Sequence, residues 1–318
     1  MGRPRRGQCA AHRRTHRSLA AGTMSAARRR TSAPDDRRQR QREPSKTAGT
    51  VTSDQLALWP SDSPAASNAR SPRAARLLTQ SNRRLKDIGV WTWTLPAWSG
   101  RLPDGRTYNT CPSAGICRQV CYALHGAYLW PVVRSRHQAN LRLVLDDLPG
   151  WQQAMINELQ TPRFAGRWVR IHDSGDFFSD DYLRAWTGVC RACPGVNFYC
   201  YTKEIDRFRR LVEPDPPDNL HWVYSYGGVQ DHSLNPGVDR VADVFPDEDA
   251  IDRAGWSSQR ASDLLAVLGP PLVGMSANRI PAFLKRIAGR RFSTWQAADT
   301  AARAAQRAVP ARPRRTPS

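Results

Sequence analysis

The stretch RWVRIHDSGDFFSDDYLRAWTGVCRACPGVNFYCYT, residues 167–202, decides the fold of this chain. It begins with the run RWVRIHD and ends with NFYCYT, and both are rich in the β-branched and aromatic residues typical of strands. Between them, Tyr182, Trp186 and Val189 recur at helical spacing, with Ser179 or Asp180 as the N-cap. A strand, a helix and a second strand in this order predict a βαβ unit with two parallel strands.

The same alternation extends on both sides of this unit. We expect further strands at residues 90–95, 220–226, 240–245 and 271–276, and further helices at 133–145, 151–159 and 205–212. Strands that alternate with helices over such a length predict an α/β fold with a mostly parallel sheet, either open or partly closed as a barrel.

The formal net charge of +20 is concentrated at the two ends of the 318-residue chain. Residues 1–80 carry 17 Lys and Arg against 5 Asp and Glu, and residues 301–318 carry 5 Arg and no acid. Both ends are poor in the large apolar residues that build a core. We therefore predict a disordered Arg-rich tail over 1–78, one α/β domain over 79–298 and a disordered basic tail over 299–318.

The basic tails admit two interpretations. Arg-rich runs bind nucleic-acid phosphates non-specifically, which makes nucleic acid a candidate partner. The simpler interpretation is that GC-rich coding DNA yields Arg and Ala in unselected segments, and Met24 is then an alternative start.

The sequence contains no recognisable export or membrane signal. No apolar run follows the N-terminal charges, as a signal peptide would require, and no segment approaches the ~18 apolar residues of a membrane span. We expect a cytoplasmic protein without a membrane partner. In that compartment cysteines stay reduced or bind metals. Among them, Cys200 lies within the apolar run NFYCYT and is typical of a buried strand residue.

Three cysteines stand close together in TCPSAGICRQVCYALHG, residues 110–126: Cys111, Cys117 and Cys121. Thiolate is the soft ligand that zinc and iron–sulfur clusters prefer, so we predict that the three sulfurs converge on one ion or cluster. The loop lies between a strand and a helix, where α/β folds place their chemistry. Cys190 and Cys193 are expected to lie outside this site.

Polar residues follow three of the predicted strands, in HDSGDFF, YTKE and YSYGG. The carboxyl ends of parallel strands build the functional site of an α/β fold. Asp176 suits an amine, a metal or a ribose, and capping of the next helix is the alternative. Lys203 is one of four lysines among 48 basic residues. It indicates a phosphate, carboxylate or nucleophilic role, and a solvated pair with Glu204 is the alternative.

Three blocks of sequence carry a resemblance to a known family: the cysteine loop with its Cys-Tyr-Ala ending, RIHDSGDFF, and FYCYTK. Over roughly residues 80–295 the chain resembles the mycobacteriophage gene product 88-like domain, which occurs in phages, plasmids and actinobacterial genomes and has no established biochemical function. The same blocks are more distantly similar to phage proteins of the radical S-adenosylmethionine (SAM) type.

The radical SAM resemblance implies a partial (β/α) barrel that holds a [4Fe–4S] cluster on the three loop cysteines, with SAM on the open iron. It also implies that Ser174, Gly175 and Asp176 lie where the amino group of SAM binds. Tyr122 is then a candidate to stack on the adenine, and Lys203 is a further candidate cofactor-binding residue. No substrate follows from the sequence.

The cysteine spacing leaves the identity of the metal open. The usual radical SAM loop is C-x3-C-x2-C, whereas this loop is C-x5-C-x3-C. A zinc site with His125 as fourth ligand tolerates the longer spacing equally well. Three hypotheses follow: a SAM-dependent iron–sulfur enzyme, a zinc-stabilised α/β protein that binds nucleic acid or a partner through its tails, and a fold with unligated cysteines.

Overall fold

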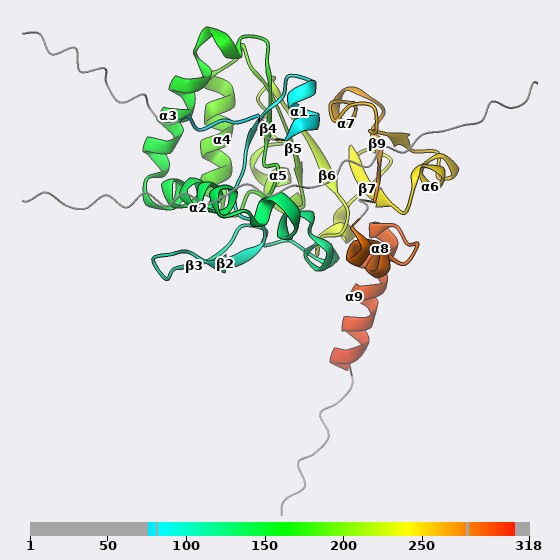
Figure 1. The fold of residues 1–318 in the computed structure, drawn as a ribbon. Coiled ribbons are helices and arrows are strands. Elements are labelled where there is room, and N and C mark those ends of the chain that lie inside the picture. The colour runs from blue at the N-terminus through cyan, green and yellow to red at the C-terminus, as the bar shows by residue number, and fades with distance from the viewer. Residues whose placement is uncertain (1–75, 81, 278–279, 309–318) are drawn as a thin grey trace, which may run out of the picture. The chain divides into compact units, whose positions relative to one another are not determined.

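A parallel sheet forms the centre of the protein (Figure 1). The structure is a computed structural model and describes residues 76–80, 82–277 and 280–308. Every neighbouring pair in the sheet is parallel, which confirms the predicted mostly parallel α/β fold. Across the sheet the described strands are β1 (Trp91–Trp93), β4 (Trp168–Ile171), β5 (Asn197–Thr202), β6 (Leu220–Ser225), β7 (Val241–Phe245), β9 (Leu272–Ser276) and β8 (Ser257–Ser258).

The strand order follows the chain order except at β8, and the described strands do not close into a barrel. All six predicted strands are present, within about two residues of their expected bounds. The predicted helix of the βαβ unit is α4 (Asp180–Ala192), and it begins where expected, because the Ser179 hydroxyl accepts a hydrogen bond from the Tyr182 backbone N–H at 3.2 Å.

Helices cover both faces of the sheet. One face packs in the main core against α2 (Pro131–Asp146), α3 (Leu148–Leu159), α4 and α5 (Ile205–Leu211). Trp93, Trp151 and Trp186 are fully buried in this core. The opposite face packs against α1 (Arg83–Asp87) and α7 (Leu265–Leu268), and α6 (Glu248–Arg253) contacts β8 and β9.

Strand β5 shows how the residue pattern orients the sheet. Phe198 and Cys200 lie in the main core, whereas Tyr199 and Tyr201 lie on the opposite face, as the two-residue period of a strand requires. Cys200 is therefore the buried strand residue that was expected. Because the strands are parallel, the loops that follow β4, β5 and β6 emerge at the same edge of the sheet.

Two local features were not predicted. Residues before the cysteine loop form an antiparallel hairpin of β2 (Ser99–Arg101) and β3 (Thr107–Asn109). The cysteine loop itself is wound into three short 3₁₀ helices rather than one turn: η1 (Ile116–Val120), η2 (Tyr122–Leu124) and η3 (Gly126–Leu129). Such short helices carry no long hydrophobic period from which a sequence could reveal them.

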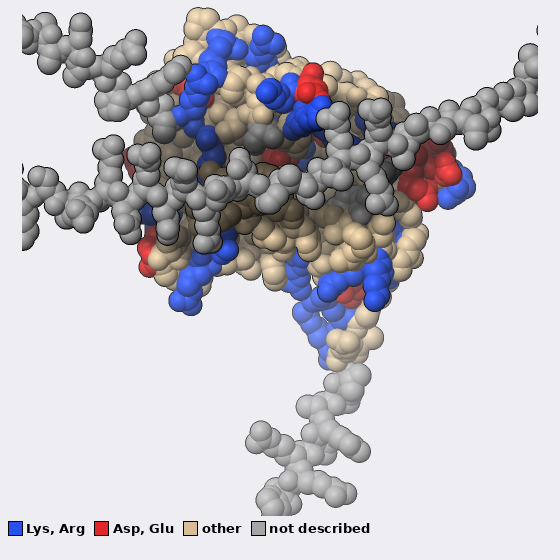
Figure 2. Space-filling model, viewed as in Figure 1, with Lys and Arg blue, Asp and Glu red and all other residues tan. Residues whose placement is uncertain are grey.

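The C-terminal helices α8 (Pro281–Ile287) and α9 (Phe292–Ala308) pack against the cysteine loop through Phe283, Phe292 and Trp295. With the segment that joins them, these helices carry six Lys and Arg against one Asp over residues 281–308, and Figure 2 shows basic side chains gathered over them. The expected start of a disordered tail at residue 299 is wrong, because α9 continues through Ala308. The alanine-rich run AADTAARAAQRA favours a helix even where it is exposed.

The N-terminal boundary also differs from the expected one. Leu78, which was assigned to the tail, is only 1% exposed and belongs to the main core. The rest of the predicted tails, residues 1–75 and 309–318, lies outside the described residues. Among the described helices, none combines the length and the apolar character needed to cross a bilayer.

Candidate functional site

The cysteine loop is attached to the sheet at the carboxyl ends of β5 and β6. The backbone N–H groups of Gly115 and Cys117 donate to the Gly227 carbonyl at 3.1 and 3.2 Å. The Ser113 N–H donates to the Glu204 carboxylate at 2.9 Å, directly after β5. From the other side, the buried Gln296 side chain of α9 accepts the Ile116 N–H at 2.7 Å. Elements far apart in the sequence therefore position the loop.

The three loop cysteines occupy one neighbourhood. Cys117 interacts electrostatically with both Cys111 and Cys121, and the three thiols are free and half-buried. Burial raises the pKa of all three, and that of Cys121 to about 11. Nearby backbone groups oppose this rise in pKa: those of Trp98 for Cys111, of Gly115 for Cys117, and of Ala123 and Leu124 for Cys121.

Asp176 lies close to the cysteines, at the end of β4. Its backbone N–H donates to the Thr110 carbonyl at 2.8 Å, next to Cys111, and its charge raises the pKa of Cys111 and Cys117. The carboxylate accepts the Thr202 hydroxyl at 2.8 Å and the Lys203 N–H at 2.9 Å. Burial raises the pKa of Asp176 itself. Asp176 thus joins the ends of β4 and β5 rather than only capping a helix.

The Lys203 side chain points into the same site. Its ammonium donates to the Ser225 hydroxyl at 2.8 Å, at the end of β6, and its charge lowers the pKa of Cys117 and Cys121. The alternative of a solvated pair with Glu204 is wrong, because Glu204 is only 3% exposed and pairs with Arg207 at 2.5 Å instead. Lys203 thus places a positive charge where it acts on two of the three thiols.

Ser174 and Gly175 hold the end of β4 against the end of β1. The Ser174 hydroxyl donates to the Leu95 carbonyl at 2.6 Å, and the Leu95 N–H donates to the Ser174 carbonyl at 3.1 Å. Gly175 has φ +85°, and a Cβ there would meet the Leu95 Cβ at 2.8 Å. Only glycine fits this turn without strain, so the turn fixes the position of Asp176.

Tyr122, directly after Cys121, is turned toward the end of β4. Its hydroxyl donates to the Asp173 carbonyl, and its ring meets Tyr128 edge-on at 5.7 Å between centroids. The Tyr128 hydroxyl donates to the Asp173 carboxylate at 2.6 Å. The Tyr122 side chain remains 41% exposed, so part of its ring is open to a ligand. His125, the candidate fourth zinc ligand, is exposed.

Two acidic groups of the site were missed. The Glu204 carboxylate accepts the Ser113 N–H of the cysteine loop. The Asp231 carboxylate accepts the N–H groups of Gly227 and Gly228, after β6, at 2.7 and 2.8 Å. Burial raises the pKa of Asp231 to about 6 and that of Glu204 to about 7. The motifs YTKE and YSYGG signalled strand ends, but which side chain turns inward depends on tertiary contacts.

No group of three or more His, Cys, Asp or Glu side chains among the described residues is arranged to hold a metal ion. A single zinc ion bound at ~2.3 Å to each sulfur requires sulfurs on the order of 4 Å apart. A four-iron cluster holds each thiolate on a different iron, so its sulfurs lie further apart.

Ionisation of Glu204 is expected to couple the stability of the protein to pH. Burial, with repulsion from Asp176, raises the pKa of Glu204 from 4.5 to about 7. The folded state therefore binds the proton of Glu204 more tightly than the unfolded state does. This tighter binding stabilises the folded protein fully below pH 4.5, and the stabilisation is lost as the pH rises through 7. Glu204→Gln stays neutral and should gain on the order of 2 kcal/mol relative to wild type between pH 5 and pH 8.

Urea unfolding at several pH values measures this difference. Asp206→Asn is the control, because it removes one carboxylate, as Glu204→Gln does, but from an exposed position on the first turn of α5. A Glu204→Gln difference that stays constant from pH 5 to pH 8 would show that Glu204 is ionised throughout that range.

Known proteins similar to this chain come from phages. A family model described as Gene product 88 matches residues 66–308. The Gene 88 protein of Mycobacterium phage L5 is 36% identical over 132 residues, which is 39% of this chain and 54% of that protein. The Gene 88 protein of Mycobacterium phage D29 is 32% identical over 117 residues, or 32% of this chain and 45% of that protein. The chain thus spans about half the length of these curated relatives, and no solved structure matches it significantly.

Proposed function

We propose, from the premise that this chain belongs to the Gene product 88 family, that it is an iron–sulfur protein that binds SAM. In this proposal Cys111, Cys117 and Cys121 hold a [4Fe–4S] cluster. Zinc is the alternative metal.

The gathering of three free, half-buried thiols in one loop supports the proposal. Cys117 interacts electrostatically with both Cys111 and Cys121, and thiolates are the ligands that hold iron–sulfur clusters. The donor set of three thiols also suits a cluster with one open iron.

The groups next to the cysteines suit the amino acid part of SAM. Lys203 offers an ammonium to the carboxylate of SAM, with Ser225 fixing its direction. Asp176 and the turn at Ser174 and Gly175 offer acceptors to the amino group. The exposed part of Tyr122 offers a ring face to the adenine. In this proposal, three strand ends and the cysteine loop supply a donor, an acceptor and an aromatic ring to SAM.

A cluster with SAM bound supplies the electron for reductive cleavage of SAM. The residues of this chain orient SAM and shield the thiolates from water. Because burial holds the pKa of the cysteines above neutral pH, cluster assembly releases protons, and assembly should be more efficient at pH 8 than at pH 6.

Replacement of Asp176 by asparagine tests the SAM site. On cluster-loaded protein, Asp176→Asn should weaken SAM binding on the order of tenfold, because a charge-assisted acceptor for the ammonium is lost. Equilibrium dialysis with labelled SAM measures the affinity, and thermal melting checks the fold. Asp218→Asn, at an exposed position, should leave the affinity unchanged.

Two results would contradict the proposal at different points. If folded Asp176→Asn binds SAM with unchanged affinity, SAM does not bind at Asp176. Cluster-loaded wild type that neither binds SAM nor, with a strong reductant, releases 5′-deoxyadenosine would exclude SAM chemistry.

A further inference from the structure

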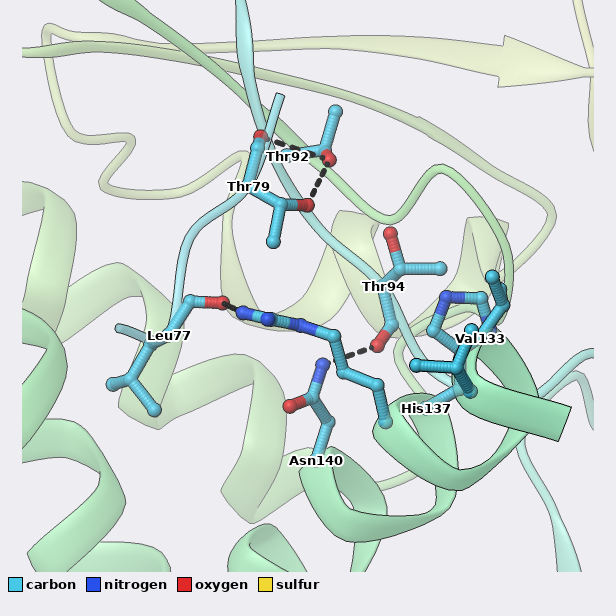
Figure 3. Close-up of a pocket in the computed structure, with 9 residues that line it drawn as sticks. Leu77, Thr79, Thr92, Thr94, Val133, His137 and Asn140 are labelled. Atoms are coloured by element: carbon cyan, nitrogen blue, oxygen red, sulfur yellow. Dashed lines mark hydrogen bonds between the residues drawn. The ribbon is translucent and has the colours of Figure 1, made fainter. Parts of the chain in front are cut away.

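A small cavity lies between β1, the edge strand of the sheet, and α2 (Figure 3). Its volume is about 160 Å³, which corresponds to roughly five water molecules at ~30 Å³ each. Figure 3 shows Thr92 of β1 and Thr94, directly after that strand, on one side and Val133, His137 and Asn140 of α2 on the other. The cavity therefore has the size of a small organic molecule.

The polar groups of the cavity are held in place by the fold. The Asn140 amide donates to the Thr94 carbonyl at 2.8 Å, so its oxygen is oriented away from that bond. Thr92 and Thr94 are only 2% and 6% exposed. The Arg136 guanidinium donates to the backbone carbonyls of Arg76 and Leu77 at 2.7 and 3.3 Å, so it is fixed at the edge of the cavity.

The charge of the lining favours an anion. Arg136 is the charged residue among the lining residues, and no Asp or Glu lines the cavity. Arg136 forms no ion pair with the carboxylates of residues 76–80, 82–277 and 280–308. Burial lowers the pKa of His137, so at neutral pH its imidazole is an uncharged hydrogen-bonding group. Leu77, Val132 and Val133 add an apolar wall.

Side chains connect this cavity to the cysteine loop. The His137 ring lies 5.8 Å from the Tyr128 ring, centroid to centroid, and the Tyr128 hydroxyl donates to Asp173. Tyr122, the neighbour of Cys121 in the chain, bonds to the carbonyl of the same Asp173. A series of contacts thus runs from the cavity lining through Tyr128 and Asp173 to Tyr122, beside Cys121.

We propose that this cavity binds a small organic carboxylate with a short apolar body and a hydroxyl group, and that this compound is the substrate class of the site. The carboxylate pairs with Arg136, the hydroxyl bonds to Thr94 or the Asn140 oxygen, and the apolar body lies against Leu77 and Val133. The assignment as substrate rests on the proposed function, whereas the binding itself does not.

Binding of 2-hydroxy-3-methylbutanoate to metal-free protein tests the cavity. Saturation-transfer NMR and titration of the His137 ring signals should give saturable binding in the millimolar range. The ring signals are assigned by their loss in His137→Gln. The uncharged amide of the same compound should bind at least about tenfold more weakly, because it lacks the charge that pairs with Arg136.

Matched variants locate the binding. Arg136→Gln should weaken binding of the carboxylate on the order of tenfold, and Thr94→Val, which keeps the side-chain shape, should weaken it by about threefold. Arg134→Gln is the control, because Arg134 is an exposed arginine of α2 outside the cavity lining. Equal effects of Arg136→Gln and Arg134→Gln, equal affinity for the amide, or no saturable binding to the folded protein would each overturn the proposal.

The same probe separates this inference from the proposed function. If the probe binds to a protein that never assembles a cluster, the cavity is a carboxylate site but not the substrate site of an iron–sulfur enzyme. A cluster-loaded protein that binds SAM but not the probe would retain the iron–sulfur function and overturn the cavity proposal.

Discussion

Replacement of Cys117 by serine is expected to abolish assembly of the iron–sulfur cluster. Cys117 is the cysteine that interacts with both of the others, and a serine oxygen is a poor ligand for iron–sulfur clusters, which prefer thiolates. After anaerobic reconstitution with iron and sulfide, wild type should be brown, and Cys117→Ser should retain less than about a tenth of the iron and sulfide. Metal analysis and visible absorption measure the loss.

The chain offers a matched control among its other cysteines. Cys193 lies at the C-cap of α4 in the main core, so Cys193→Ser should keep the full cluster content. Full cluster content in Cys117→Ser would exclude the three-cysteine site. Colourless wild type that binds one zinc ion per chain would establish the zinc alternative, with loss of that zinc in Cys117→Ser.

Gly115→Ala is expected to produce the largest loss of stability among single-methyl changes in the cysteine loop. A Cβ at residue 115 would meet the Gln296 Oε1 at 2.0 Å and the Gly227 carbonyl oxygen at 2.8 Å. Gln296 is buried and already accepts the Ile116 N–H, so it cannot move away without leaving a buried donor unpaired. We expect the free energy of unfolding to fall by about 3 kcal/mol.

Urea unfolding measures this loss, and alkylation of the cysteines under native conditions reports whether the loop has opened. Gly195→Ala is the control, because a Cβ there meets nothing within 4 Å. It should leave stability within about 0.5 kcal/mol of wild type. A stable Gly115→Ala variant with protected cysteines would mean that α9 does not hold the loop in solution.

The strands could be predicted from sequence because each contains its own signal. In β4, Val169 and Ile171 lie in the main core, whereas Arg170, which alternates with them, is half-buried and bonds to Asp263 at 3.3 Å. Such a two-residue period is visible without knowledge of the partner strand. Helix α9 was not predicted from the sequence, because its alanines bury little and apolar spacing does not reveal it.

The candidate site was predictable in its residue types and not in its contacts. Cys111, Cys117 and Cys121 lie close together in the chain, and Asp176 and Lys203 follow strands. Local sequence therefore indicated each of them. The role of Glu204 could not be predicted, because its partner Ser113 lies 91 residues away. The same holds for Gln296, whose partner Ile116 lies 180 residues away.

The sequence by itself determined the parallel α/β fold, the cysteine loop and the polar strand ends, because periodicity and turn chemistry act over a few residues. Only the tertiary structure decided that α9 holds the cysteine loop, that Lys203 faces the thiols and bonds to Ser225 rather than Glu204, and that a cavity opens between β1 and α2. These outcomes depend on burial and on hydrogen bonds between distant segments. Their free energies exist only once the chain has folded, so no local pattern records them.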